Sequence, residues 1–184
     1  MNGIIKECET RVRRTYRGGA LLDVFLGRQR GTDGFFPEDW ISSFVEAKNR
    51  DYIPGEGITR LEDGRLITDA VGGGMFGQGR TEPGVLIKLL DSGERLGIQV
   101  HPTDAYAKKL FGSDYGKTES WHVLSTRRIN DEEPKVYLGF KPGLTRELWT
   151  EYYRTQNVNA MLNALHAVSY THLRAHETLM KLVC

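Results

Sequence analysis

Four residues whose side chains can bind a metal ion or polarise a substrate lie close together in the middle of the chain. They are Gln99, His101, Lys117 and Glu119. Residues 98–101 have the composition of a strand, in which side chains two apart point to one face, so Gln99 and His101 would share a face. Glu119 begins a second strand-like run, and its carboxylate could meet the other two between the strands. Imidazole and carboxylate donors suit Zn²⁺, although other divalent ions can use them, and an amide oxygen is a weaker, rarer ligand.

The spacing of these residues also allows a simpler interpretation. A His-Pro pair and a single loop glutamate occur in many proteins that bind no metal, and His101 would then be an ordinary surface histidine. Lys117 lies two residues before Glu119. It would therefore lie near the rim of the same site in either case.

The segments that carry these residues resemble the core signature of class I mannose-6-phosphate isomerases, zinc enzymes of the cupin superfamily. The resemblance rests on Ile-Gln-Val-His-Pro at 98–102 and Gly-Lys-Thr-Glu at 116–119, followed by an aromatic and hydrophobic strand. Segments 86–91, 38–42 and 14–22 also resemble the family, and the likeness covers roughly residues 4–167. Arg13 departs from it, because the family often has tryptophan there.

The resemblance implies a fold and a partial ligand set. The fold would be mainly β, an incomplete jelly-roll cupin barrel, with short helices after the metal strand and at the C-terminal end. Zinc would be held by Gln99, His101, Glu119 and a further histidine that the resemblance places after residue 166. A later substrate-binding arginine is expected beyond the same point. His166 itself is expected on a helix face and is not assigned as the missing ligand.

The function implied by the resemblance is interconversion of mannose 6-phosphate and fructose 6-phosphate, with Lys117 as a catalytic residue. The partner would be a small sugar phosphate, for which Ser42 and Lys88 are weak phosphate-binding candidates. Ser42 can equally be an ordinary strand serine. The alternative function is a cupin sugar-binding or regulatory module that keeps the metal strand but does not turn over substrate.

Composition sets limits on other classes of function. The 184 residues are 39% hydrophobic and 27% charged, which suits about one globular domain. A net charge of +1 favours neither nucleic acid nor an anionic membrane surface, and no apolar run is long enough to span a membrane. Two cysteines make no disulfide framework, so the cytoplasm is the expected compartment. The sequence does not indicate an oligomeric state.

Hydrophobic patterning and turn residues predict the elements that position the site. Strands over 85–90 and 96–101 are expected to pair as a hairpin through a turn at 92–95. Thr103 can cap a helix over 104–111 that Gly112 ends. The other expected elements are a helix over 20–26, strands over 40–47, 119–124 and 136–140, and helices over 146–155 and 158–166.

The last part of the chain reads as foreign to the rest. Residues 168–178, VSYTHLRAHET, can be translated from DNA that resembles a transposon-end adapter of shotgun sequencing libraries, and the final Leu-Val-Cys fits its continuation. Lys181 does not fit without a base difference. We therefore expect a domain over 1–167 and a non-native tail over 168–184 that does not pack on it. On this interpretation His172, His176 and Cys184 carry no function.

Overall fold

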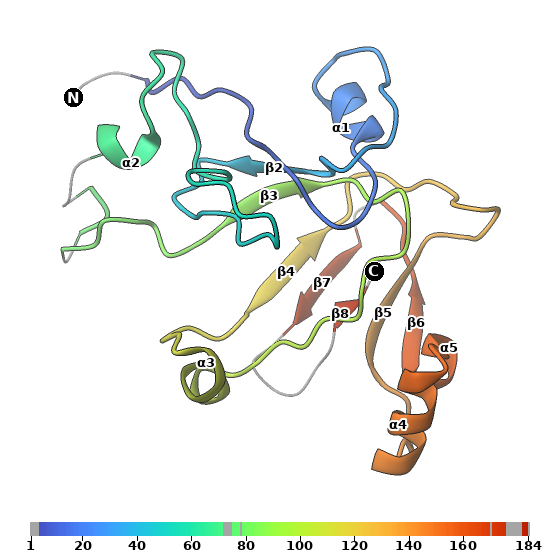
Figure 1. Ribbon diagram of the computed structural model, residues 1–184. Helices are drawn as coiled ribbons and strands as arrows, with labels where there is room; N and C mark the ends of the chain where they lie inside the picture. The colour runs from blue at the N-terminus through green and yellow to red at the C-terminus, as the bar shows by residue number, and fades with distance from the viewer. Residues whose placement is uncertain (1–3, 72–74, 78, 170, 176–181, 184) are drawn as a thin grey trace. The chain divides into compact units, whose positions relative to one another are not determined.

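The computed structural model describes residues 4–71, 75–77, 79–169, 171–175 and 182–183. The chain forms two compact units, Met1–Glu94 and Arg95–Cys184, each with its own buried clusters (Figure 1). No helix within the described residues is long and apolar enough to cross a membrane.

The first unit is organised around a small antiparallel sheet. Its strands, in spatial order, are β1 (Arg11–Val12), β2 (Glu38–Ile41) and β3 (Ile87–Leu90). The buried residues Val12, Trp40 and Ala47 pack together, with Leu86 against them. Trp40 and Lys88 are directly opposite each other in the β2–β3 ladder. The sheet therefore brings a polar residue of β3 beside the most buried stretch of β2.

Helix α1 (Ala20–Phe25) is held at its N-terminus by a residue far away in sequence. One carboxylate oxygen of Asp91 accepts hydrogen bonds from the backbone N–H of Gly19, at 3.0 Å, and of Leu21, at 2.8 Å. These bonds satisfy amide donors that no carbonyl within the helix can reach. Gly18 allows this approach, because a Cβ there would lie 1.9 Å from the backbone oxygen of Asp91. The Gly-Gly pair is thus required by close packing as well as by the turn.

The segment after β2 does not continue as the expected strand over 40–47. Ser42 has a φ of 46°, in the left-handed region, and this turn ends β2 at Ile41. The chain then folds over a second cluster around the short helix α2 (Ile67–Ala70). Its buried members are Leu61, Ile67, Ala70 and Val71. The predicted strand was therefore too long, because a local turn interrupts the alternating pattern.

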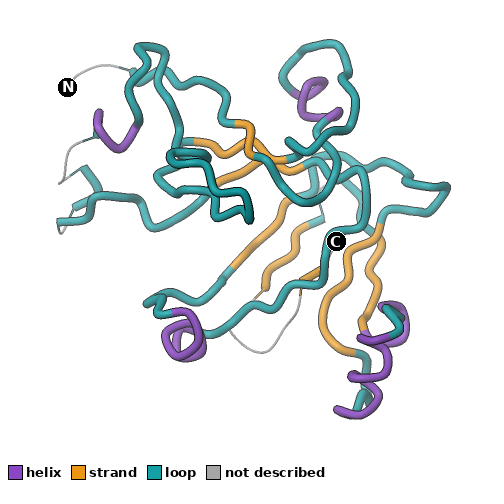
Figure 2. Tube along the Cα trace, viewed as in Figure 1, coloured by secondary structure: helices purple, strands orange, loops and turns teal. Residues whose placement is uncertain are grey.

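The second unit contains two sheets and three helices among its described residues. Figure 2 shows where its strands and helices lie along the trace. One sheet pairs β4 (Glu119–His122) with β7 (His172–Ala175), and the other has the order β6 (Leu162–His166), β5 (Lys135–Phe140) and β8 (Leu182–Val183). All of these pairs are antiparallel. The unit consists mostly of strands and short helices. Its described strands form no closed barrel.

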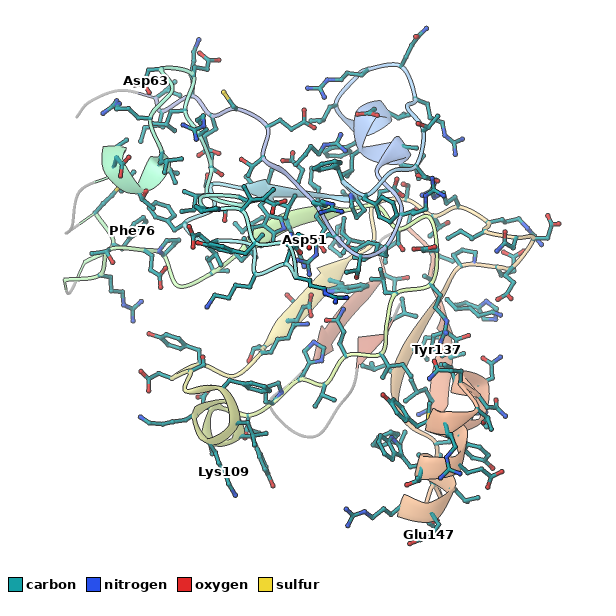
Figure 3. The ribbon with its side chains drawn as sticks, in the orientation of Figure 1. Asp51, Asp63, Phe76, Lys109, Tyr137 and Glu147 are labelled. Atoms are coloured by element: carbon teal, nitrogen blue, oxygen red, sulfur yellow. The ribbon has the colours of Figure 1, made fainter. Side chains whose placement is uncertain are left out.

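The core of the second unit lies where β5 and β6 meet the helices α4 (Arg146–Arg154) and α5 (Val158–Met161). Its buried members are Tyr137, Val158, Met161 and Leu162, and Ile98, Leu144, Trp149 and Tyr152 pack against them. Tyr137 lies beside these helices, and its hydroxyl donates to the Asn159 side chain at 2.8 Å (Figure 3). Because Ile98 packs against this cluster, the segment just before His101 is held at the core.

Helices form where the sequence predicts them over 104–111 and from residue 146, the first with both predicted caps. The Thr103 hydroxyl accepts from the N–H of Tyr106 at the start of α3 (Asp104–Phe111), and Gly112, with a φ of 66°, ends it. Thr145 caps α4 in the same way. Both helices are specified by local capping, which a sequence displays directly.

Two other expectations are wrong. Residues 96–101 form neither a strand nor a hairpin with β3, because β3 pairs with β2 and residues 96–101 have no ladder partner. Residues 158–166 are not one helix: α5 ends at Met161, and β6 pairs with β5 from Leu162. In that ladder Val136 faces Leu165 and Tyr137 faces Ala164. Long-range pairing overrides the helical spacing of the apolar residues there.

The expectation that residues after 167 do not pack is also wrong for those that the structure describes. β7 pairs with β4, and β8 pairs with β5. The physical reason is that β4 and β5 present unpaired edges, which accept any extended segment that can reach them. His176 and Cys184 lie outside the described residues.

Candidate metal centre

The segment that carries Gln99 and His101 has no ladder partner, and burial along it does not alternate as it would in a strand. His101 is buried, with 3% of its surface exposed, whereas Val100 before it is 64% exposed. Gln99 lies on the surface. The imidazole is therefore inserted into the second unit, and the amide of Gln99 lies nearer to solvent.

A docked loop holds Lys117 opposite this segment. The N–H of Lys117 donates to the backbone oxygen of Pro102 at 3.1 Å, and the N–H of Gly116 donates to the Asp104 carboxylate at 2.6 Å. A Cβ on Gly116 would lie 2.5 Å from the Pro102 oxygen, so only glycine allows so close an approach. The start of α3 thus serves as the anchor for the loop that leads into β4.

The four residues singled out by the sequence lie close together, and His101 and Lys117 share one carboxylate oxygen of Glu119. Oε2 of Glu119 lies 2.8 Å from Nε2 of His101, in a hydrogen bond, and 3.0 Å from Nζ of Lys117, in an ion pair. Lys117 also donates to Oε1 of Gln99. Glu119 is the first residue of β4, which places its side chain at the end of the strand nearest the docked loop.

The electrostatics of this cluster favour an ionised Glu119. Burial of the carboxylate by itself would raise its pKa. The hydrogen bond with His101, the charge of Lys117 and a hydrogen bond from Trp121 outweigh that effect and lower the pKa of Glu119 to about 2. At neutral pH the site therefore presents a negatively charged carboxylate next to an imidazole.

The residues present fit a zinc-type ion in their chemistry. The imidazole of His101 contacts the carboxylate of Glu119, the amide oxygen of Gln99 is linked to that carboxylate through Lys117, and Nδ1 of His101 is buried without a hydrogen-bond partner. A cationic group already bridges the two oxygen donors, since the ammonium of Lys117 contacts both Gln99 and Glu119. Gln99, His101 and Glu119 are the residues that would hold the ion.

No group of three or more His, Cys, Asp or Glu side chains able to hold a metal occurs within the described part of the chain. The expected second histidine ligand is thus not among those residues near His101 and Glu119. His166 lies on β6, where it is paired with Lys135 of β5. It is accordingly a strand residue and not the helix-face residue expected from the sequence.

The two weak phosphate candidates have protein partners in the first unit. The hydroxyl of Ser42 donates to Oε1 of Glu7 at 2.5 Å, and its N–H donates to Oε2 of the same carboxylate. Nζ of Lys88 lies 3.6 Å from Oε1 of Glu38. Ser42 therefore stabilises the turn after β2, and Lys88 serves as a counter-charge for a buried acid.

Glu38 is a buried acid that sequence reasoning missed. Its side chain is 2% exposed and accepts hydrogen bonds from the hydroxyl of Tyr16, at 2.5 Å, and the indole of Trp40, at 2.7 Å. Nε of Arg14 lies 3.3 Å from the same carboxylate, which Lys88 also approaches. The one signal for this cluster in the sequence is a glutamate two residues before a core tryptophan, on the same face of β2.

Comparison with solved structures places the fold. The chain aligns over 98% of its length with 55% of the mannose 6-phosphate isomerase from Bacillus subtilis, at a TM-score of 0.68 and 21% identity. The structure of a "putative mannosephosphate isomerase" from Archaeoglobus fulgidus gives a TM-score of 0.67 at 17% identity over 97% of this chain and 57% of that one. The chain thus has the fold of the corresponding parts of these proteins.

Sequence comparison finds relatives of the same description. A "Probable mannose-6-phosphate isomerase" of Bacillus subtilis is 32% identical over 90 residues, which is 49% of this chain and 27% of that protein. The mannose-6-phosphate isomerase of Streptococcus mutans is 39% identical over 64 residues, 35% of this chain and 19% of that protein. The matched segments therefore span about a quarter or less of these relatives, and no protein-family profile matches the chain.

Proposed function

We propose that this chain is part of a zinc-dependent aldose–ketose isomerase that interconverts mannose 6-phosphate and fructose 6-phosphate. The observation that carries the proposal is the shared contact of Glu119 with His101 and Lys117, next to Gln99. The resemblance of the sequence to this family and the relatives described as mannose-6-phosphate isomerases support the same conclusion.

The reaction class explains why these side chains would be needed. Isomerisation moves a proton between C1 and C2 through an enediol-like state, in which negative charge grows on the carbonyl oxygen. A bound zinc ion would supply Lewis-acid polarisation of that oxygen. Gln99, His101 and Glu119 would hold it, with His101 fixed by burial. Lys117 lies at the rim with 42% of its side chain exposed, where its ammonium can stabilise charge on substrate or move a proton.

Within this proposal, the described residues supply a partial site. We assign no described residue as the base that removes the carbon-bound proton, as the fourth metal ligand or as the substrate-binding arginine. We also infer that residues 168–184 are not native to the enzyme, from their likeness to adapter DNA, and that the enzyme is cytoplasmic, from its few cysteines. The chain as it stands should therefore bind zinc weakly and show no turnover.

The test is a coupled assay of mannose 6-phosphate turnover with added zinc. It should be run on this chain and on the protein encoded by the uninterrupted gene that continues from His166. We expect activity in the second and none in the first. Absence of turnover in the uninterrupted protein, with zinc bound, would reject the isomerase proposal.

A sugar-binding or regulatory module without turnover is the second candidate. It is favoured by the engagement of the Lys117 ammonium with both Gln99 and Glu119, which leaves the proposed catalytic group occupied by the protein itself. Calorimetry with mannose 6-phosphate distinguishes the two candidates. Binding of the sugar phosphate by the uninterrupted protein, without conversion to fructose 6-phosphate, would select the module.

A further inference from the structure

Lys117 contacts the two oxygen donors that the proposed metal site would use. Its ammonium lies 3.0 Å from Oε2 of Glu119 and donates to Oε1 of Gln99. The same Oε2 accepts the hydrogen bond from His101 at 2.8 Å. A single cationic group thus bridges these donors at the position where an ion that shared them would also contact them.

A divalent ion bound to the same two oxygens would lie in contact with this ammonium. Each oxygen has a second lone pair, but two cations at such short range would repel each other strongly. Binding of the ion therefore requires Lys117 to leave Gln99 and Glu119. The ion would have to displace an existing charge partner of the carboxylate in addition to its own water.

We propose that Lys117 is an internal counter-cation: it keeps the site assembled without metal, competes with the metal for Glu119 and Gln99, and is displaced when the metal binds. This inference rests on the metal site of the proposed function. The inference adds that metal binding comes first and releases the ammonium of Lys117, which can then interact with substrate.

The way the loop is held makes such a displacement feasible. The backbone of Lys117 is fixed by the hydrogen bond to Pro102, and Gly116 is fixed to Asp104. The side chain beyond that anchor is 42% exposed, so the ammonium can turn into solvent while the loop stays in place. Glu119 is only 15% exposed and remains at the start of β4. The moving part is therefore one long side chain.

The main experiment measures zinc affinity by calorimetry on the full chain and on Lys117→Met, which keeps the apolar stem and removes the charge. Lys117→Arg keeps the charge, and Lys117→Gln replaces the methionine variant if that one does not fold. Lys108→Met is the matched control, because Lys108 forms an ion pair of 2.9 Å with Asp114 on the surface of the same unit. Binding that survives in His101→Ala is subtracted as binding elsewhere.

The expected result is a zinc dissociation constant lower by about tenfold in Lys117→Met, since one competing unit charge at contact distance is lost. Lys117→Arg and Lys108→Met should bind within about twofold of the unchanged chain. If Lys117→Met bound zinc as tightly as the unchanged chain or more weakly, the proposal that Lys117 competes with the metal would be overturned.

A second measurement uses no metal. With a chelator present, Lys117→Met should melt at a lower temperature than Lys108→Met, because Glu119 loses its counter-charge. An unchanged melting temperature would overturn the assembling role of Lys117. If no variant binds zinc but Lys117→Met is still destabilised, the metal site of the proposed function fails and the displacement fails with it, while the counter-cation role stands.

Discussion

Replacement of Glu119 by glutamine should remove a pH-dependent part of the stability of the second unit. The substitution keeps the shape of the side chain but removes the charge that faces Lys117, at 3.0 Å, and accepts from His101, at 2.8 Å. The pKa of Glu119 is lowered from 4.5 to about 2 in the folded chain. A lowered pKa means that folding favours the ionised form, so the stabilisation is complete above the unfolded pKa.

The size of the effect follows from that difference in pKa. At about 1.36 kcal/mol per pKa unit, it corresponds to at most about 3 kcal/mol. Lys117 is 42% exposed, and solvent screening reduces the attainable value to about 1–2 kcal/mol. The contribution should be full at pH 7 and be lost as the pH falls from about 5 towards 2.

The assay is urea unfolding of the metal-free chain, with chelator, at pH 7 and at several values down to pH 3. Glu119→Gln should be less stable by about 1–2 kcal/mol at pH 7 and should lose less stability on acidification than the unchanged chain. Glu133→Gln is the control, because Glu133 forms a surface ion pair with Arg128 in the same unit. Equal stability of Glu119→Gln and the unchanged chain at pH 7 would refute the reasoning.

Three further predictions concern the first unit, catalysis and the end of the chain. Gly18→Ala should destabilise the first unit by about 2 kcal/mol or more in urea unfolding, because its Cβ would lie 1.9 Å from the Asp91 oxygen; Gly34→Ala, with open space around it, should not. In the uninterrupted protein, Lys117→Ala should keep its metal and lose turnover, and full activity would reject a catalytic lysine. Deletion of residues 169–184 should lower the melting temperature by on the order of 5 °C, because β4 and β5 lose partners, and an unchanged value would contradict that pairing.

Elements specified by local chemistry could be predicted from the sequence. Thr103 and Gly112 mark both ends of α3, and Thr145 marks the start of α4, since a cap is formed by residues within one turn of it. Of the predicted ligands, His101 contacts Glu119 directly, and Gln99 is linked to Glu119 through Lys117. The strand face predicted to carry Gln99 and His101 did not form, because residues 96–101 pair with no strand and Gln99 is exposed while His101 is buried.

Elements that depend on distant partners could not be predicted. The apolar residues of 158–166 recur at helical spacing, but β5 draws Leu162–His166 into a ladder. The Glu38 cluster depends on Arg14 and Tyr16 from one segment and on Lys88 from another, which the sheet and its loops bring to Glu38. A sequence read locally shows none of these long-range contacts.

Zinc binding by this chain and by its His101→Ala variant tests the central claim most directly. Both proteins are dialysed against the same zinc buffer, and bound metal is measured against protein concentration, with Lys109→Ala, a change on the surface of α3, as the control. We predict that the unchanged chain and the control each hold more zinc than His101→Ala does, with a difference of at most one ion per chain. Equal zinc content in all three proteins would contradict a metal centre at Gln99, His101 and Glu119.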